Sequence, residues 1–345
     1  MSRVLHYKHP MYKVLYIHPA KADARCGPSP LMMEGGVQRM SEVLYQKLGV
    51  AVNQLALDLL TRQEGERIPS ISEYQEKFQF SRGTIQNALN FLKESEAVEL
   101  VSRGHLGTFI EHLDYRRLQE CSFNKELLGT MPMPYSLCYQ GLATALYRSL
   151  SPYAFNLLYA RGAESRLKLL TTGVCQFTVC SRHAAEEAIR HRTDVEIAVD
   201  LGPGTYLSQH VLVFREPGKT AIERGMRVAY DRASMDHRHL TEMMCAGVRN
   251  IKLVELKAHQ TVPAILAGQV DAGVWNLDDI LESGYEGLNL VPIHQTSGAS
   301  AFTSAALVIR RGDENMAQVL RQYVQPAAVL EIQDAVRSGT SPADF

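Results

Sequence analysis

The chain has 345 residues, of which 46% are hydrophobic and 21% charged, and its formal net charge is −1. This length exceeds what one hydrophobic core usually organises, so we expect two or three domains. No run approaches the roughly 18 uninterrupted apolar residues of a membrane span, and the near-neutral charge argues against indiscriminate polyanion binding. These features favour a cytoplasmic protein with no membrane partner.

The N-terminal segment has little with which to build a core. Its first residues, MSRVLHYKHPMYKVLYIHP, interrupt every apolar run and so do not form a secretory signal. We interpret residues 1–39 as a disordered leader. Glu34-Gly35-Gly36 can be encoded by a bacterial ribosome-binding sequence, so translation starting at Met40 is one hypothesis. A natural flexible arm is the alternative.

Three helices and a hairpin are predicted within residues 40–112. Apolar residues at helical spacing mark a helix over about 47–63, and a capping box of Ser70 and Glu73 begins a second. Ser81 caps a third helix, whose apolar stripe is Ile85, Ala88, Leu89 and Leu92. The β-rich runs 97–102 and 107–110 then flank a Gly-rich turn, as in a wing. The pattern predicts a winged helix-turn-helix.

The polar face of the third helix and the wing are predicted to contact a double-stranded DNA operator. Planar amides can pair bidentately with adenine, while arginine suits phosphate or guanine. The candidate DNA-binding residues are Ser81, Arg82, Thr84, Gln86, Asn87, Asn90, Arg103 and His105. Residues 40–110 carry seven lysines and arginines against nine aspartates and glutamates, so we expect a homodimer that doubles the contacts. The alternative is a protein-docking winged helix.

The segment IPSISEYQEKFQFSRGTIQNALNFLKESEAVELVSRGHLGTFI, residues 68–110, resembles the DNA-binding domain of GntR-type regulators. The likeness lies in the Pro-Ser start, the Ser-Arg-x-Thr-hydrophobic helix, and the wing that ends in Gly-Thr-Phe-hydrophobic. The segment departs from that pattern at Gln86, where many such proteins carry a base-reading arginine, and at Leu106, a wing-tip place that is often basic. The resemblance therefore implies a different operator.

Beyond a predicted linker, residues 113–125, helix-like and strand-like segments alternate over residues 126–345, which is typical of an α/β domain with largely parallel sheets. Aligning Gly173 with Gly268 exposes an internal echo, LLTTGVCQFTVCSR against ILAGQVDAGVWNLD. Each reads as a helix, a glycine stop and a strand, and Ser181 matches Asn276 at the two strand ends. We predict lobe 1 at about 126–202 and 292–345 and lobe 2 at about 206–288, with crossings near residues 202–204 and 288–294.

Paired lobes of this kind resemble the type II periplasmic-binding-protein fold used as an effector domain in bacterial regulators. The segments MPMPYSLCYQGLA, RGAESRLKLLTTG, VCSRHAAE, LGPGTY and VDAGVWN are similar to the YhfZ family of transcriptional regulators. That resemblance runs from about Met40 almost to the end. It implies a fold and a regulatory class, and it brings no known effector.

Ligands of open α/β sheets bind beyond the carboxyl ends of the strands, so the two lobes should share a cleft. We expect a small polar or anionic metabolite there, held by Arg161 and Arg182, with Asp231 available for an amine or hydroxyl. The candidate ligand-binding residues are Pro134, Tyr135, Ser136, Arg161, Gly162, Ser181, Arg182, Thr205, Tyr206, Asp231, Ser234, Trp275 and Asn276.

Other chemistry finds little support. The six cysteines show no CxxC, and His237 and His239 point to different faces of a helix, so we expect no metal, disulfide or cofactor. No Ser lies in a GxSxG elbow, and no Gly-rich phosphate loop is complete. The sequence therefore predicts a ligand-responsive transcriptional regulator that is not an enzyme. The alternative is an enzyme or small-molecule-binding protein of the same two-lobed fold whose winged helix mediates protein contacts.

Overall fold

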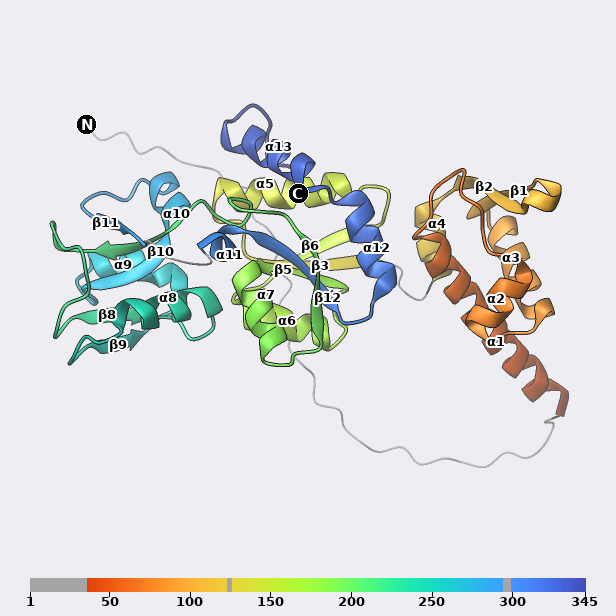
Figure 1. Cartoon of the computed structure of the whole chain (residues 1–345), viewed down its shortest axis with the longest axis horizontal. Coiled ribbons are helices and arrows are strands. Elements are labelled where there is room, and N and C mark those ends of the chain that lie inside the picture. Colours follow the sequence, from red (N-terminus) through yellow and green to blue (C-terminus); the bar gives the residue numbers. More distant parts are fainter. Residues whose placement is uncertain (1–35, 123–125, 294–298) are drawn as a thin grey trace, which may run out of the picture. The chain divides into compact units, whose positions relative to one another are not determined.

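The winged helix comes first in the part of the chain that a computed structural model describes, residues 36–122, 126–293 and 299–345 (Figure 1). Its elements are α1 (Gly36–Leu59), α2 (Ile71–Phe78), α3 (Arg82–Glu94), β1 (Val98–Ser102), the 3₁₀ turn η1 (Gly104–Leu106) and β2 (Thr108–Leu113). Residues 1–35 of the predicted leader lie outside the described residues, whereas residues 36–39 differ from that prediction because they begin α1. All contacts described below lie within one unit, residues 45–345.

The predicted caps and apolar stripe of the winged helix are confirmed. Ser70 Oγ accepts from the Glu73 amide at 3.3 Å, and the Glu73 carboxylate accepts from the Ser70 amide at 2.6 Å. Gln79 ends α2 in the left-handed region, with φ of 57°, which turns the chain toward the start of α3. The four apolar residues predicted for α3 are all buried. Helix α3 is thus fixed by its buried face and leaves its polar face to solvent.

The segment predicted to be a linker contains a helix, α4 (Tyr115–Cys121). Asp114 caps it by accepting a hydrogen bond from the Arg117 amide, and Leu118 is fully buried in a core that continues from the winged helix into lobe 1. β2 also runs one residue past the predicted domain boundary, to Leu113. The segment predicted to be a linker thus includes a helix that packs into the core.

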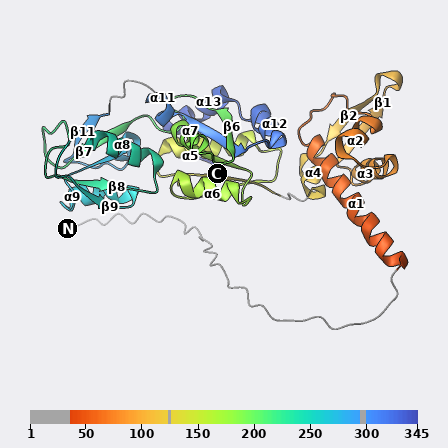
Figure 2. The same cartoon turned by 60° about the horizontal axis from the view of Figure 1, so that its bottom comes forward.

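Lobe 1 is a five-stranded sheet with helices on both faces. Its strands are β3 (Leu127–Met131), β4 (Phe155–Tyr159), β5 (Phe177–Ser181), β6 (Val195–Asp200) and β12 (Ala305–Arg310), in the order β4-β3-β5-β12-β6. One face packs against α5 (Leu137–Ser149), α12 (Glu314–Tyr323) and α13 (Pro326–Arg337), and the other against α6 (Ala163–Thr171) and α7 (Arg182–Arg190), as Figures 1 and 2 show. Alternate residues of β12 enter the two cores, Leu307 on one side and Val308 on the other.

Lobe 2 repeats this three-layer plan. Its strands are β7 (His210–Phe214), β8 (Arg227–Tyr230), β9 (Lys252–Glu255), β10 (Ala272–Asn276) and β11 (Asn289–Pro292), in the order β11-β7-β10-β8-β9. Helices α8 (Met235–Cys245) and α11 (Ala299–Thr303) contribute to the core on one face. The turn η2 (Ala258–Gln260), α9 (Thr261–Leu266) and α10 (Leu277–Glu282) contribute to the core on the other.

Two predictions about the sheets were wrong in part. They are mixed rather than largely parallel, because β12 runs antiparallel to β5 and β6, and β7 runs antiparallel to β10 and β11. These strands follow the two crossings, so they enter their sheets from the opposite end. β11 also extends lobe 2 to Pro292, beyond the predicted end at 288, because it pairs with β7.

The internal echo is confirmed at single-residue register. β5 and β10 have the same length, and the alignment of Gly173 with Gly268 superposes both their starts and their ends. Both glycines adopt positive φ, 79° and 69°, directly after a helix. Ser181 and Asn276 therefore close equivalent strands and begin equivalent helices.

A buried carboxylate holds α1 and α2 together. Asp58 is only 4% exposed, and its oxygens accept from Arg62 Nε at 2.8 Å, the Tyr74 hydroxyl at 2.9 Å and Lys77 Nζ at 2.5 Å. Burial alone would raise the pKa of Asp58, but the bonds to Arg62 and Lys77 outweigh it and hold the pKa below its ordinary value of 3.8. Asp58 is thus ionised and paired.

We expect Asp58→Asn to lower the free energy of opening of the winged helix by about 2 kcal/mol at neutral pH, because Arg62 stays partly buried without its counter-charge. The measurement is amide hydrogen exchange across α1 to α3. Because the folded pKa is depressed, the stabilisation is present above pH 3.8 and is lost as the pH falls through the folded value, so the difference from wild type should shrink in acid. Glu99→Gln, at an exposed strand position, is the control; equal exchange in both variants would contradict the assignment.

Candidate functional site

The polar face of α3 is the candidate nucleic-acid surface. Ser81 Oγ accepts from the Thr84 amide at 3.2 Å, so this predicted pair holds the first turn of the helix. Arg82, Gln86 and Asn87 are exposed, and Gln86 Nε2 donates to Asn90 Oδ1 at 3.3 Å. A bond between exposed amides is readily exchanged for bonds to a base edge. The helix therefore presents exposed side-chain amides whose orientation is set by a weak mutual bond and whose other donors and acceptors remain available.

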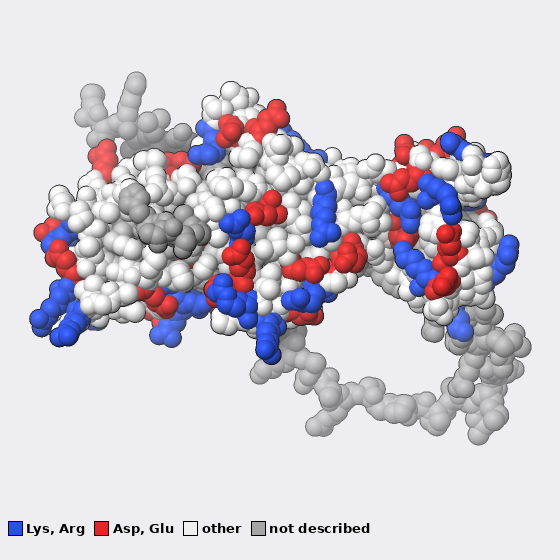
Figure 3. All heavy atoms as spheres, in the orientation of Figure 1, with Lys and Arg blue, Asp and Glu red and all other residues white. Residues whose placement is uncertain are grey.

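The wing carries the remaining predicted contacts. The Arg103 guanidinium lies 4.6 Å from the centroid of the Phe109 ring, which orients this cation at the tip. His105 is exposed, and Leu106 is 57% exposed. Basic and acidic side chains alternate over the face of residues 45–345 seen in Figure 3, with no continuous basic patch on that face of the winged helix. Binding to a phosphate backbone would thus rest on a few placed cations.

A second candidate site is a cavity of about 100 Å³ between the two lobes. It brings together eight of the predicted ligand-binding residues, namely Tyr135, Arg161, Gly162, Tyr206, Asp231, Ser234, Trp275 and Asn276. Residues that the sequence reasoning missed complete the wall, among them Tyr139, Arg166, Asp236, His237 and His259. Lobe 1 supplies two arginines, and lobe 2 supplies two aspartates and two histidines. The cavity is therefore polar, aromatic and balanced in charge.

Five predicted residues do not line this cavity, and four of them make hydrogen bonds within the fold instead. Ser136 caps α5 by accepting from the Tyr139 amide, and Pro134 lies in the loop before it. Arg182 donates to Asp200 at 3.0 Å and to Ser300 Oγ at 2.8 Å. The other two are Thr205, which lies where the chain crosses between the lobes, and Ser181, which contacts lobe 2.

Thr205 lies where the chain crosses between the lobes. Its hydroxyl donates to Gly202 O at 2.6 Å and accepts from the Ala305 amide at 2.9 Å, so it ties the two crossing strands together. Gln333, only 1% exposed, donates from Nε2 to Thr205 O at 2.8 Å and to Cys138 O at 3.0 Å. This buried amide anchors the hinge to α5 and α13. Sequence reasoning missed Gln333, because a single glutamine in an amphipathic helix carries no signal.

The first turn of α8 meets both matching strand ends. Ser181 Oγ donates across the lobe boundary to Asp236 Oδ1 at 2.8 Å while accepting from the Ala184 amide. Within lobe 2, Asn276 Oδ1 is 3.1 Å from His237 Nε2. The two ends of the internal echo are thus bonded to consecutive residues of one helix. Ser181 is fully buried, so it closes the lobes rather than facing the cavity.

Other contacts across the same boundary keep the lobes closed. Arg161 and Asp231 form an ion pair at 3.7 Å, and the Leu137 amide donates to Glu282 at 2.6 Å. Gly162 has φ of 74°, and a Cβ built there would lie 2.6 Å from Ala233 O in lobe 2. Only a glycine allows this approach, since any side chain would strike a backbone carbonyl.

Histidine rings fill the boundary beside the cavity. His183 of lobe 1 stacks on Phe302 with ring centroids 4.0 Å apart, and His239 of lobe 2 lies 4.7 Å from His183. Burial lowers the pKa of His183 to about 4 and lowers the pKa values of His210 and His237 too. These imidazoles are neutral in the closed form. Among the described residues no group of His, Cys, Asp or Glu has the geometry of a metal site.

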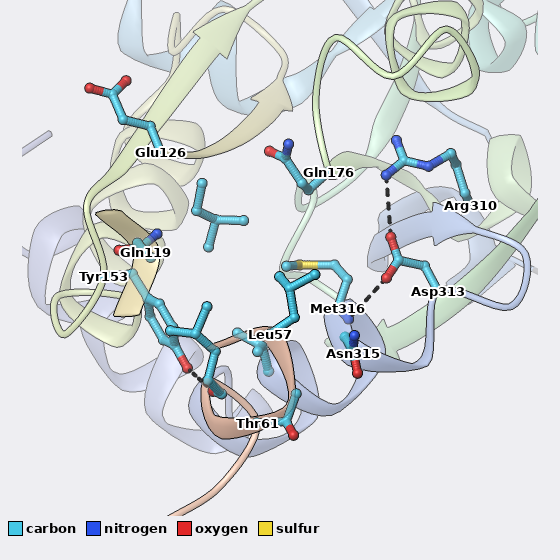
Figure 4. A pocket seen from close by; sticks show the side chains of 13 residues that line it. Leu57, Thr61, Gln119, Glu126, Tyr153, Gln176, Arg310, Asp313, Asn315 and Met316 are labelled. Atoms are coloured by element: carbon cyan, nitrogen blue, oxygen red, sulfur yellow. Dashed lines mark hydrogen bonds and ion pairs between the residues drawn. The ribbon is translucent and has the colours of Figure 1, made fainter. Parts of the chain in front are cut away.

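A further cavity, of about 110 Å³, lies where the end of α1 meets lobe 1 (Figure 4). Leu57, Leu127, Met316 and other apolar side chains line much of it. Arg310 is held by Asp313 at 3.2 Å and by two backbone carbonyls. We interpret it as a packing gap at a domain junction, because its charged groups already have partners.

Taken together, a winged helix-turn-helix followed by two lobes with two crossings defines the class: a helix-turn-helix protein with a domain like the type II periplasmic binding proteins. The family model of a helix-turn-helix domain matches residues 63–110, and the model of the YhfZ C-terminal domain matches residues 114–343. The chain belongs to the YhfZ family. In the described residues, no helix has the length and apolarity needed to span a bilayer.

Two YhfZ relatives agree with this assignment. The chain is 31% identical over 306 residues to the uncharacterized protein YhfZ of Escherichia coli (strain K12), covering 89% of this chain and 100% of that protein. The crystal structure of YhfZ from Shigella flexneri is 30% identical with a TM-score of 0.53, covering 64% of this chain and 93% of that one. A periplasmic substrate-binding protein of an ABC transporter from Coxiella burnetii is 14% identical with a TM-score of 0.44, covering 62% and 97%.

We expect Gly162→Ala to open the lobes, because the added methyl group collides with Ala233 O. Gly173→Ala is the matched control, since it imposes a similar strain at φ of 79° at the other end of α6 but meets nothing within 4 Å. The chain's one tryptophan, Trp275, lines the cavity and is 6% exposed, so acrylamide quenching of its fluorescence reports closure. Quenching should rise in Gly162→Ala alone; equal quenching in the two variants would contradict the closed arrangement.

Proposed function

We propose that the protein is a DNA-binding transcriptional regulator that responds to a small polar metabolite held between its lobes. The helix-turn-helix and the membership of the YhfZ family support a DNA-binding regulator. The observation that carries the sensing role is the polar cavity, which both lobes line and which interlobe contacts close. A ligand that touches both lobes favours the closed form by its differential affinity. On this proposal the protein works in the cytoplasm and is not an enzyme.

The GntR-like reading of the winged helix assigns separate roles to its side chains. On this reading Arg82, in the first turn of α3, contacts a phosphate, and the exposed amides Gln86, Asn87 and Asn90 contact base edges. Arg103 and His105 of the wing would follow the backbone or the adjacent groove. Anionic groups on the metabolite would be received by Arg161, which is the more exposed of the two cavity arginines.

We expect Arg82→Ala to weaken binding to every DNA sequence and to lower the salt slope by about one, because it removes one phosphate contact. Gln86→Ala should instead change the preferred base at one or two positions, by about 1–3 kcal/mol. Operators would be selected from a random duplex library, and affinities then measured by fluorescence anisotropy at several salt concentrations. Arg116→Ala, which removes an exposed arginine from α4 with the same change in charge, is the control. Wild-type binding by all three variants would contradict these roles.

The regulator is expected to bind as a homodimer, since one slightly acidic winged helix offers few phosphate contacts and two-fold symmetry doubles them. Light scattering of the complex with a selected operator should give twice the 38.5 kDa chain mass plus the mass of the duplex, and the operator itself should be palindromic. A single chain on each operator at all concentrations would contradict dimeric binding.

A further inference from the structure

Two opposite charges line the cavity without an ion-pair partner among the described residues. Arg166 is 2% exposed and donates to Val179 O, Ala160 O and the Tyr206 hydroxyl, none of which is an anion. Asp236 is 7% exposed, and the only hydrogen bond that its carboxyl group makes with the described residues is the one from Ser181. Buried charges are normally paired or bind ions, so each of these two groups could accept a charged ligand group of the opposite sign.

Of the two charged groups, Asp236 has fewer hydrogen-bond partners. Arg166 satisfies three of its N–H groups through the backbone and Tyr206, whereas Asp236 has one neutral hydroxyl. Arg161 pairs with Asp231 at 3.7 Å, and no ion pair joins it to Asp236. His237, the next residue, is neutral and engages Asn276. Asp236 thus borders a polar space with one hydrogen bond from a neutral hydroxyl and no ion pair among the described residues, although the charge of Arg166 acts on it from nearby.

We propose that this cavity holds its ligand through a protonated amine that pairs with the Asp236 carboxylate. The inference rests on the proposed sensing function and narrows its ligand class: an anion alone would lie beside Asp231 and Asp236 and leave Asp236 without a directly paired counter-charge, whereas an ammonium group supplies one. Any anionic group on the same molecule faces Arg161 and the remaining N–H groups of Arg166. Tyr139, Tyr206 and Trp275 wall the cavity and suit the attached carbon skeleton.

Amine binding at this place has a proton signature. Burial raises the pKa of Asp236 to about 7, although the bond from Ser181 and the charge of Arg166 lower it. The empty closed form therefore carries a protonated Asp236 below that pH. Binding the ammonium group ionises the carboxyl: its proton goes to solvent, and a carboxylate–ammonium pair replaces the neutral acid. Affinity should rise about tenfold per pH unit between pH 5 and 7 and level off above.

The test uses matched pairs of probes that differ in the amine: ethanolamine and ethylene glycol, alanine and lactate, serine and glycerate, putrescine and 1,4-butanediol. Thermal shift and Trp275 fluorescence of the full chain identify binders, and calorimetry at pH 6 in buffers of different ionisation enthalpy counts protons. We expect an amine-bearing member to bind with release of close to one proton, and its partner to bind at least tenfold more weakly. Binding of the deaminated members instead, or no amine-dependent shift in any pair, overturns the proposal.

Asp236→Asn keeps an oxygen for the Ser181 hydroxyl and removes the charge. It should abolish proton release and weaken amine binding by about tenfold or more, whereas Asp194→Asn, at an exposed site in lobe 1, should do neither. Unchanged proton release in Asp236→Asn would place the amine elsewhere and overturn the assignment. The two proposals can be told apart. Amine binding that leaves DNA affinity unchanged would contradict the sensing role. Regulation of DNA binding by a deaminated acid would contradict only the proposed ligand class.

Discussion

The closed form depends on the first turn of α8, where consecutive residues reach two different strand ends. Asp236 accepts from Ser181 across the lobe boundary, and His237 pairs with Asn276 inside lobe 2. The internal echo explains why one short turn can do this. β5 and β10 end at equivalent places, so their terminal side chains are brought to the same helix from opposite sides. A helix N-terminus is well placed to offer such short contacts, because its cap fixes the turn.

Burial of polar and titratable side chains around that turn limits the stability of the closed form. A carboxyl and several imidazoles lose solvent on closure, and both His183 Nε2 and His237 Nδ1 find no hydrogen-bond partner in the described part of the chain. Unmet buried polar groups oppose burial by roughly 1–3 kcal/mol each. Purely apolar lobes would close without a ligand. A boundary rich in titratable groups instead leaves the equilibrium between open and closed forms to whatever occupies the cavity, as the proposed sensing role requires.

The sequence alone predicted the features that depend on interactions between residues close together in the chain. The capping box at Ser70, the stripe of α3 and the glycine stops of the echo follow from neighbouring residues, and all are present. What it could not show were contacts made in three dimensions. Thr205 and Ser181 were expected at the ligand, but the fold uses one at the hinge and the other for closure. Asp236 was missed because the segment MDHRHL drew attention only to the spacing of its histidines.

Contacts at the end of α1 constrain how ligand binding in the cavity could affect the winged helix. Its last carbonyls would otherwise lack partners, yet Leu60 O accepts from the Tyr153 hydroxyl and Thr61 O from Gln318 Nε2, both in lobe 1. One apolar core also continues from α1 through α4 into lobe 1. Lobe 1 and the winged helix are therefore joined by hydrogen bonds and by packing, whereas in the described residues lobe 2 contacts lobe 1 at the hinge and at the closure contacts. Under the proposed function, ligand binding repositions lobe 2, and its effect on DNA must pass through what lobe 2 touches in the assembled dimer.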